Sequence, residues 1–207
     1  MRSHCWTVRS AIPLTALYAL LLTGQPQAQP LSGEALLKSL RQGGHVIVMR
    51  HTSSPRQAPD KQTANADNSN FERQLDAAGR SGATAMGEAF RRLRIPVGVV
   101  LSSPTYRALE TVRYAKFGNP QTHPELGDGG QSMQAGTEAQ VTWLRQKAGQ
   151  FPRGTNTLIV THQPNIAGAF AQLAADVADG EALVFGPDGK GGSALVARVK
   201  IEDWPRM

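Results

Sequence analysis

The sequence contains one cysteine among its 207 residues. A single thiol excludes an internal disulfide framework and the cysteine-rich zinc sites. Hydrophobic runs are also short, and none reaches the roughly 18 residues that span a bilayer. The 21 glycines and 13 prolines follow no period, which excludes collagen-like and low-complexity classes. Hydrophobic residues still make up 40% of the chain, enough for one core, so we expect a single globular domain of mixed type.

Residues 1–28 have the features of a secretory signal peptide. Arg2 and Arg9 give a basic start, residues 11–22 are apolar, and a polar segment ends in small residues at Ala28. This order of basic, apolar and small-residue regions is typical of export signals. An uncleaved membrane anchor is the alternative, disfavoured by the short apolar run.

Cleavage after Ala28 would leave residues 29–207 as a single periplasmic or secreted domain, without stable membrane insertion. It would remove Cys5 and two arginines, leaving 20 basic and 16 acidic residues, a net charge of +4, and no thiol. Such a mild charge suits anionic small molecules, whereas nucleic-acid binding needs a clustered basic stripe. The basic cluster at residues 91–94 fits the solvated end of a helix. We therefore expect no nucleic-acid partner, and the sequence leaves the oligomeric state open.

Three short apolar runs, at residues 45–50, 97–103 and 157–162, are continuous rather than alternating. Continuous runs are typical of strands buried on both faces of a parallel sheet. Apolar residues at helical spacing occupy the segments between and after them: Gly82, Met86, Ala89 and Leu93; Val141, Leu144 and Ala148; Ile166, Phe170, Leu173 and Val177. The alternation predicts a three-layer α/β/α sandwich with a mostly parallel sheet.

The C-terminal part has a different pattern. The runs ALVF and ALVARVKI, joined by GPDGKGGS, predict a β-hairpin with a glycine-rich loop. Residues 52–70 and 118–136 are long, polar and poor in strand formers. Long loops in a compact domain are usually functional or mobile.

Polar residues follow each of the three predicted central strands. The first strand ends in Arg50-His51, the second in Ser102-Ser103, and the third in His162. Ligands of open parallel sheets bind beyond the carboxyl ends of the strands. We therefore expect these side chains to share one pocket.

A helix is expected directly after the second strand. Pro104 fits its first turn, because the missing N–H would be unpaired there, and Ser103 is the predicted N-cap. Arg107 would then project from the first turn, beside free backbone N–H groups and the positive end of the helix dipole. Together with the groups at the other strand ends, it would form a phosphate-sized anion site.

Each of these residues alone has an ordinary structural explanation. A lone arginine on a helix is usually a solvated charge, and a lone histidine at a strand end usually serves the fold. Two histidines and an aspartate could also suggest a metal. However, His51 and His162 lack local ligand spacing, and two arginines would repel a divalent ion. We expect neither a metal nor a cofactor.

Four segments in order resemble the histidine phosphatase superfamily, which has the phosphoglycerate-mutase-like fold. They are VIVMRHTSSP, with its Arg-His pair; ERQLDAAGRSGATAMGEAFRRL; LSSPTYRALETV; and VTHQPNI. The resemblance covers the chain from about Gly44 to Phe170. The expected export signal is similar to that of a small secreted or periplasmic branch of the family. Thr52 and Gln163 stand where the family usually has glycine. Neither departure is expected to abolish the chemistry.

The resemblance implies a role for each residue of the pocket. His51 would attack phosphorus as a neutral imidazole and form a phosphohistidine that water hydrolyses. Arg50 and Arg107 would grip the phosphoryl oxygens and keep the histidine unprotonated. His162 would donate a further hydrogen bond.

The general acid is the member that the resemblance defines least. The family commonly has an acid two residues after a leucine in the loop following the next strand. THPELGDGG supplies Leu126 and then Asp128, with Glu125 as the alternative. The long insertions of the phosphomutases and their Glu-Gly run beyond the acid are missing, which favours hydrolysis over mutase activity.

The resulting hypothesis is a histidine-type phosphatase that hydrolyses a small phosphorylated substrate, such as an envelope or sugar phosphate. The alternative is a non-catalytic phosphate-binding envelope protein on the same fold. A third hypothesis, a structural envelope protein that binds anionic surfaces, is disfavoured by the convergence of polar groups at three strand ends.

Overall fold

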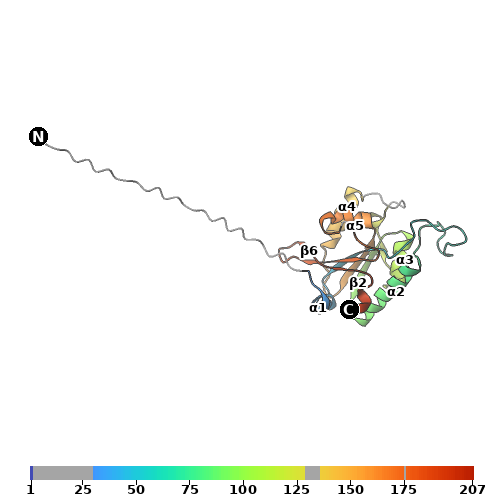
Figure 1. The fold of residues 1–207 in the computed structure, drawn as a ribbon, viewed down its shortest axis with the longest axis horizontal. Coiled ribbons are helices and arrows are strands. Elements are labelled where there is room, and N and C mark those ends of the chain that lie inside the picture. The colour runs from blue at the N-terminus through green and yellow to red at the C-terminus, as the bar shows by residue number, and fades with distance from the viewer. Residues whose placement is uncertain (2–29, 129–135, 175) are drawn as a thin grey trace.

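The computed structural model describes residue 1 and residues 30–128, 136–174 and 176–207 (Figure 1). The expected signal peptide therefore lies outside the described residues, apart from Met1. The end of the second predicted loop, at residues 129–135, also lies outside them.

The described chain alternates helices and strands and closes with a hairpin. The strands are β1 (Val46–Arg50), β2 (Val97–Ser102), β3 (Gln121–Thr122), β4 (Asn156–Thr161), β5 (Ala182–Pro187) and β6 (Ser193–Val199). The helices are α1 (Gly33–Gln42), α2 (Ala77–Arg92), α3 (Tyr106–Ala115), α4 (Glu138–Ala148), α5 (Gln163–Ala169) and α6 (Ala171–Ala174), with short 3-10 turns η1 (Pro124–Leu126) and η2 (Trp204–Arg206).

The strands form one six-stranded sheet in the order β3-β2-β4-β1-β5-β6. Strands β3, β2, β4 and β1 run parallel, while β5 is antiparallel to β1 and β6 is antiparallel to β5. The three continuous apolar runs are the three central parallel strands, as predicted. The predicted C-terminal hairpin is β5 and β6.

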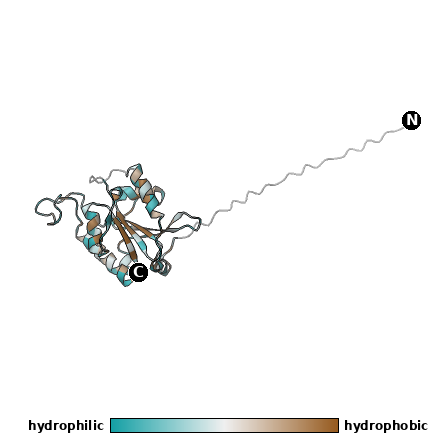
Figure 2. Cartoon of the chain, turned by 180° about the vertical axis from the view of Figure 1, so that it is seen from behind, coloured by the Kyte–Doolittle hydropathy of each residue, from teal (hydrophilic) through white to brown (hydrophobic). Residues whose placement is uncertain are grey.

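Helices cover both faces of this sheet, so the predicted three-layer sandwich is confirmed (Figure 1). Successive side chains of a strand point to opposite faces. In β1, Ile47 and Met49 pack with α1, α2 and α3, whereas Val46 and Val48 pack with α4 and α5. Figure 2 shows the result as hydrophobic strands between helices of mixed polarity. Burial on both faces explains why β1 and β4 show no alternation in sequence.

The predicted helix through Ile166 and Val177 is wrong in its length. α5 ends at Ala169, because Phe170 leaves the helical conformation with φ −132°. The Phe170 ring then packs against Phe185 of β5, with 4.5 Å between the ring centroids. The helical spacing of apolar residues did not distinguish one continuous helix from the two short helices α5 and α6.

The prediction of Ser103 as the N-cap of α3 is also wrong. The N-cap is Thr105, and the helix begins at Tyr106, two residues after Pro104. The Ser103 hydroxyl instead accepts from the Thr105 amide at 3.2 Å. Arg107 nevertheless lies in the first turn of the helix, as expected.

The sequence pattern did not predict α1, which buries three leucines against the sheet: Leu36, Leu37 and Leu40. In the part of the chain that the structure describes, no helix combines the length and apolarity needed to cross a membrane.

Leu158 of β4 is fully buried at the centre of the sheet, so Leu158→Ala should leave a cavity in the core. We expect it to lower the free energy of unfolding by about 2–5 kcal/mol in urea titrations. Leu173→Ala removes the same atoms from a side chain that is 43% exposed, and serves as the matched control. Equal effects of the two substitutions would contradict this assignment of the core.

Candidate active site

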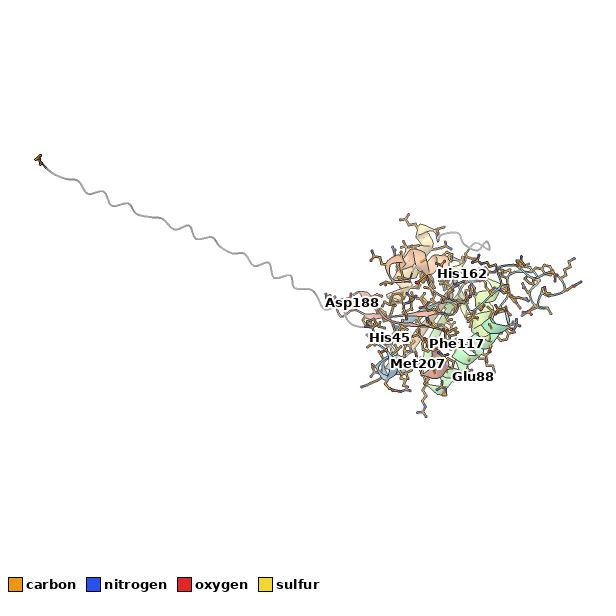
Figure 3. The ribbon with its side chains drawn as sticks, in the orientation of Figure 1. His45, Glu88, Phe117, His162, Asp188 and Met207 are labelled. Carbon is orange, nitrogen blue, oxygen red and sulfur yellow. The ribbon has the colours of Figure 1, made fainter. Side chains whose placement is uncertain are left out.

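The candidate site lies at the carboxyl ends of β1, β2 and β4. Arg50 pairs with Thr161 in register, and the His51 amide donates to the Thr161 carbonyl oxygen at 2.9 Å. Residues that follow β1 and β4 are therefore neighbours. His162 and His45, both labelled in Figure 3, mark the two opposite ends of these parallel strands.

His51 is buried, and its hydrogen bonds define its tautomer. Its Nδ1 lies 2.7 Å from the Thr52 carbonyl oxygen. A carbonyl can only accept, so Nδ1 carries the hydrogen, and the lone pair of the neutral ring is on Nε2. The Arg107 Nε–H points at this Nε2 from 3.2 Å. His51 therefore presents an unprotonated nitrogen to the pocket.

The pKa of His51 is held well below its ordinary value. The main cause of the low pKa is burial, which disfavours the charged ring. The charges of Arg107 and Arg50, and of His162 when its ring is protonated, act in the same direction. His51 is therefore neutral near neutral pH, as a nitrogen nucleophile must be.

Arg107 connects the other groups of the site. It is the second residue of α3, and it is only 3% exposed. Besides His51, its guanidinium contacts His162 Nδ1, at 3.1 Å from Nη2, and the Asp128 carboxylate through an ion pair. The Asp128 Oδ2 lies 3.6 Å from His162 Nδ1. The structure thus brings together all four of these predicted site residues.

His162 has the opposite tautomer to His51. Its Nδ1 accepts from Arg107, so its Nε2 carries the hydrogen and donates to the Ser103 hydroxyl at 2.9 Å. Burial lowers its pKa well below the ordinary value, with contributions from Arg107, Arg73 and Arg50. The two histidine rings lie 5.2 Å apart in an edge-to-face arrangement.

Arg50 is held from the side of the pocket opposite α3. Its Nη1 donates to the Val177 carbonyl at 3.0 Å, and its Nη2 pairs with Asp179 at 2.7 Å. Its Nε is buried without a hydrogen-bond partner among the described residues. A buried donor without a partner is costly, and an anion oxygen would satisfy it. Sequence reasoning did not identify Asp179, which lies in a turn with no recognisable motif.

The structure separates the two candidate acids. Asp128 is buried in the pocket, and its segment is pinned to the sheet by Thr161, whose hydroxyl donates to the Leu126 carbonyl at 2.8 Å. Glu125 lies outside the pocket, with 40% of its side chain exposed, near the imidazole of His123.

Sequence reasoning missed Arg73, whose charge acts on the groups of this site. Its charge contributes to lowering the pKa of both His162 and Arg107. The Asp128 carboxylate contributes in the opposite direction to the pKa of Arg73, because it favours the charged guanidinium. Its Nε and Nη2 donate to the carbonyl oxygens of Pro55 and Ser54, at 2.7 and 3.2 Å. Arg73 belongs to the ERQLD segment, which in the sequence indicated only the start of α2.

The charges of the pocket suit an anion better than a cation. Within the described residues, no group of three or more histidine, cysteine or acidic side chains could hold a metal ion. The charges of Arg107, Arg50 and Arg73 act on the neutral imidazole of His162, and the first two also act on His51, while one buried carboxylate pairs with Arg107. Such a pocket can bind phosphate oxygens and present a nitrogen lone pair to phosphorus.

Solved structures share this fold at low sequence identity. No protein-family model matches the chain, and no curated protein matches its sequence. The protein histidine phosphatase SixA complexed with tungstate is 17% identical to this chain, with a TM-score of 0.54. The match covers 77% of this chain and 98% of the SixA chain. A SixA protein from Agrobacterium tumefaciens is also 17% identical, with a TM-score of 0.50 and coverages of 75% and 97%. A phosphoserine phosphatase variant from Entamoeba histolytica, in complex with phosphoserine, is 11% identical, with a TM-score of 0.51 and coverages of 76% and 98%. The chain therefore has the phosphoglycerate-mutase-like fold of these solved structures.

The depressed pKa values of His51 and His162 predict a loss of stability in acid. Below about pH 6.5 the unfolded chain binds protons on these histidines that the folded chain does not bind. The free energy of unfolding should therefore fall as the pH is lowered from about 6.5 to 5, and His51→Asn should make that fall smaller. Urea titrations across this range measure it, with His123→Asn as the control for removing an imidazole outside the pocket. Equal pH dependence in all three proteins would contradict the neutral, buried state of His51.

Proposed function

We propose that this protein hydrolyses phosphate monoesters through a phosphohistidine on His51. The observation that carries the proposal is the unprotonated Nε2 of a buried neutral His51, aimed at the guanidinium of Arg107. A nitrogen nucleophile beside a phosphate-binding group is the arrangement that phosphoryl transfer to histidine requires.

The arginines would supply the electrostatic part of catalysis. In phosphoryl transfer the charge is spread over the equatorial oxygens, so positioning and charge stabilisation dominate. Arg50 is at the end of β1, next to His51 in the chain, and Arg107 reaches His51 from α3. The unpartnered Nε of Arg50 and the planar fork of Arg107 can each bind a phosphoryl oxygen.

Two displacements would complete the reaction. In the first, the Asp128 carboxylate takes the proton of a monoester that binds as its monoanion. His51 Nε2 then forms a bond to phosphorus, the bond to the ester oxygen breaks, and Asp128 transfers that proton to the oxygen as the alcohol leaves. In the second, the Asp128 carboxylate takes a proton from water, whose oxygen attacks phosphorus and releases inorganic phosphate from the histidine. Asp128 is placed for this role by its position in the pocket, where it contacts both Arg107 and His162.

We further propose that the substrate is a small envelope or sugar phosphate and that the protein is exported. The support is the basic, apolar and small-residue order of residues 1–28 and the mild positive charge of the remainder.

A phosphoenzyme on His51 is the direct test of the proposed reaction. A histidine N–P bond is labile in acid and stable in alkali, unlike a serine ester. Brief reaction of the full chain with labelled substrate, followed by an alkaline quench, should leave the label on the peptide that contains Arg50 and His51. His51→Ala should remove both the label and the turnover. Turnover without label, or label that survives acid, would exclude this nucleophile, and phosphate binding without turnover would support the non-catalytic alternative.

Arg107→Lys tests the electrostatic part of the mechanism with the charge retained. One ammonium cannot reach His51, His162 and Asp128 at once, so we expect a loss of kcat/KM of about a hundredfold or more. Arg91→Lys, on the exposed end of α2, is the matched control and should behave like the wild type.

The leaving group distinguishes a general acid from a residue that only supports the loop. A stable phenolate needs little protonation, whereas an alkoxide needs it strongly. Asp128→Asn should hardly slow the hydrolysis of p-nitrophenyl phosphate, but it should slow that of a sugar phosphate by about a hundredfold. Glu125→Gln should affect neither substrate. If Glu125→Gln alone causes the selective loss, the acid is Glu125.

Export is tested by the N-terminus of the native protein. Mass spectrometry of protein recovered from the periplasm or the medium should find a chain that begins near Gln29. An intact Met1 in a cytosolic fraction would contradict export.

A further inference from the structure

The loop of residues 52–75 runs beside α3, and two contacts tie it to that helix (Figure 1). The Glu72 carboxylate accepts from the amide of Tyr106, the first residue of α3, at 2.9 Å. The Leu75 amide donates to the Glu110 carboxylate, also on α3, at 2.8 Å. Arg73 lies between these two attachment points, so both of its flanks are fixed to the helix that carries Arg107.

Glu110 is the more deeply buried of the two anchors. Its side chain is 1% exposed, and all of its described hydrogen-bond partners are donors. Its Oε2 accepts from the Leu75 amide, while its Oε1 accepts from Asn65 Nδ2 and Arg113 Nη2, both at 3.0 Å. We call the contact between Glu110, Asn65 and Leu75 the Glu110 clasp.

The chemistry of the clasp requires a carboxylate. An amide in place of the carboxylate would have to direct its NH₂ group at one of these donors, leaving that donor unpaired. Glu110→Gln therefore disrupts the clasp although it keeps the size and shape of the side chain. Glu110 is also three residues after Arg107, on the same helix, and its described hydrogen-bond partners are Asn65, Leu75 and Arg113 rather than groups of the pocket.

We propose that Glu110 is a positioning residue that fixes the distance between Arg73 and Arg107, so that both guanidinium groups act on the same bound phosphoryl group. The proposal rests on the proposed function. It differs from a purely structural role, in which Glu110 would stabilise the loop without affecting how the pocket binds an oxyanion.

A double-mutant cycle between Glu110 and Arg73 separates the two roles. We expect Glu110→Gln and Arg73→Ala each to raise KM for a phosphate monoester, and the dissociation constant for vanadate, by about tenfold. The double variant should be no worse than Arg73→Ala alone, because Glu110 acts through Arg73. The matched control is Glu88→Gln, the same substitution at an exposed position of α2.

Each outcome of the cycle decides the proposal. Effects that multiply in the double variant, or a Glu110→Gln protein that binds vanadate like the wild type, would overturn it. If Glu110→Gln does not fold, Asn65→Ala removes one donor from the clasp and should weaken vanadate binding only when Arg73 is present. If the wild type binds vanadate but hydrolyses no ester, the proposed function fails, and the vanadate cycle still tests the clasp.

Discussion

The guanidinium of Arg107 is the contact on which the rest of the site depends. It reaches Nε2 of His51, Nδ1 of His162 and the carboxylate of Asp128 from a single position in the first turn of α3. A buried cation is costly unless charges and hydrogen bonds compensate it. Here one carboxylate and two ring nitrogens do so, and both nitrogens can accept only while their rings are neutral. The contact that stabilises the arginine is thus the same contact that requires an unprotonated nucleophile.

α3 also binds two segments next to the pocket. The Thr111 hydroxyl accepts from the Thr52 amide at 3.2 Å, directly after His51, and Glu110 accepts from the Leu75 amide. The helix therefore aligns the end of β1 and the long loop with the arginine that it carries. This explains why a loop without helix or strand can bring Arg73 to the site.

The sequence predicted the sheet and most of the site, because buried parallel strands end at one edge and their polar residues follow directly. The family resemblance implied Asp128 from its spacing to Leu126, but only the fold shows that Asp128 is buried at the pocket while Glu125, three residues earlier, is exposed. Arg73 and Asp179 could not be predicted, because loop and turn geometry bring them to the pocket, and no periodicity encodes that geometry. The same limit explains the error at Phe170, where packing against Phe185 ends a helix whose apolar spacing continues.

A crystal structure with vanadate would test the central claim most directly, because vanadate adopts the geometry of a phosphoryl group in transfer. We expect vanadium within bonding distance of His51 Nε2, with its oxygens bound by Arg107 and by the Nε of Arg50. Vanadate bound elsewhere, or bound while His51 Nε2 faces away from it, would contradict the claim that this pocket transfers phosphoryl groups to His51.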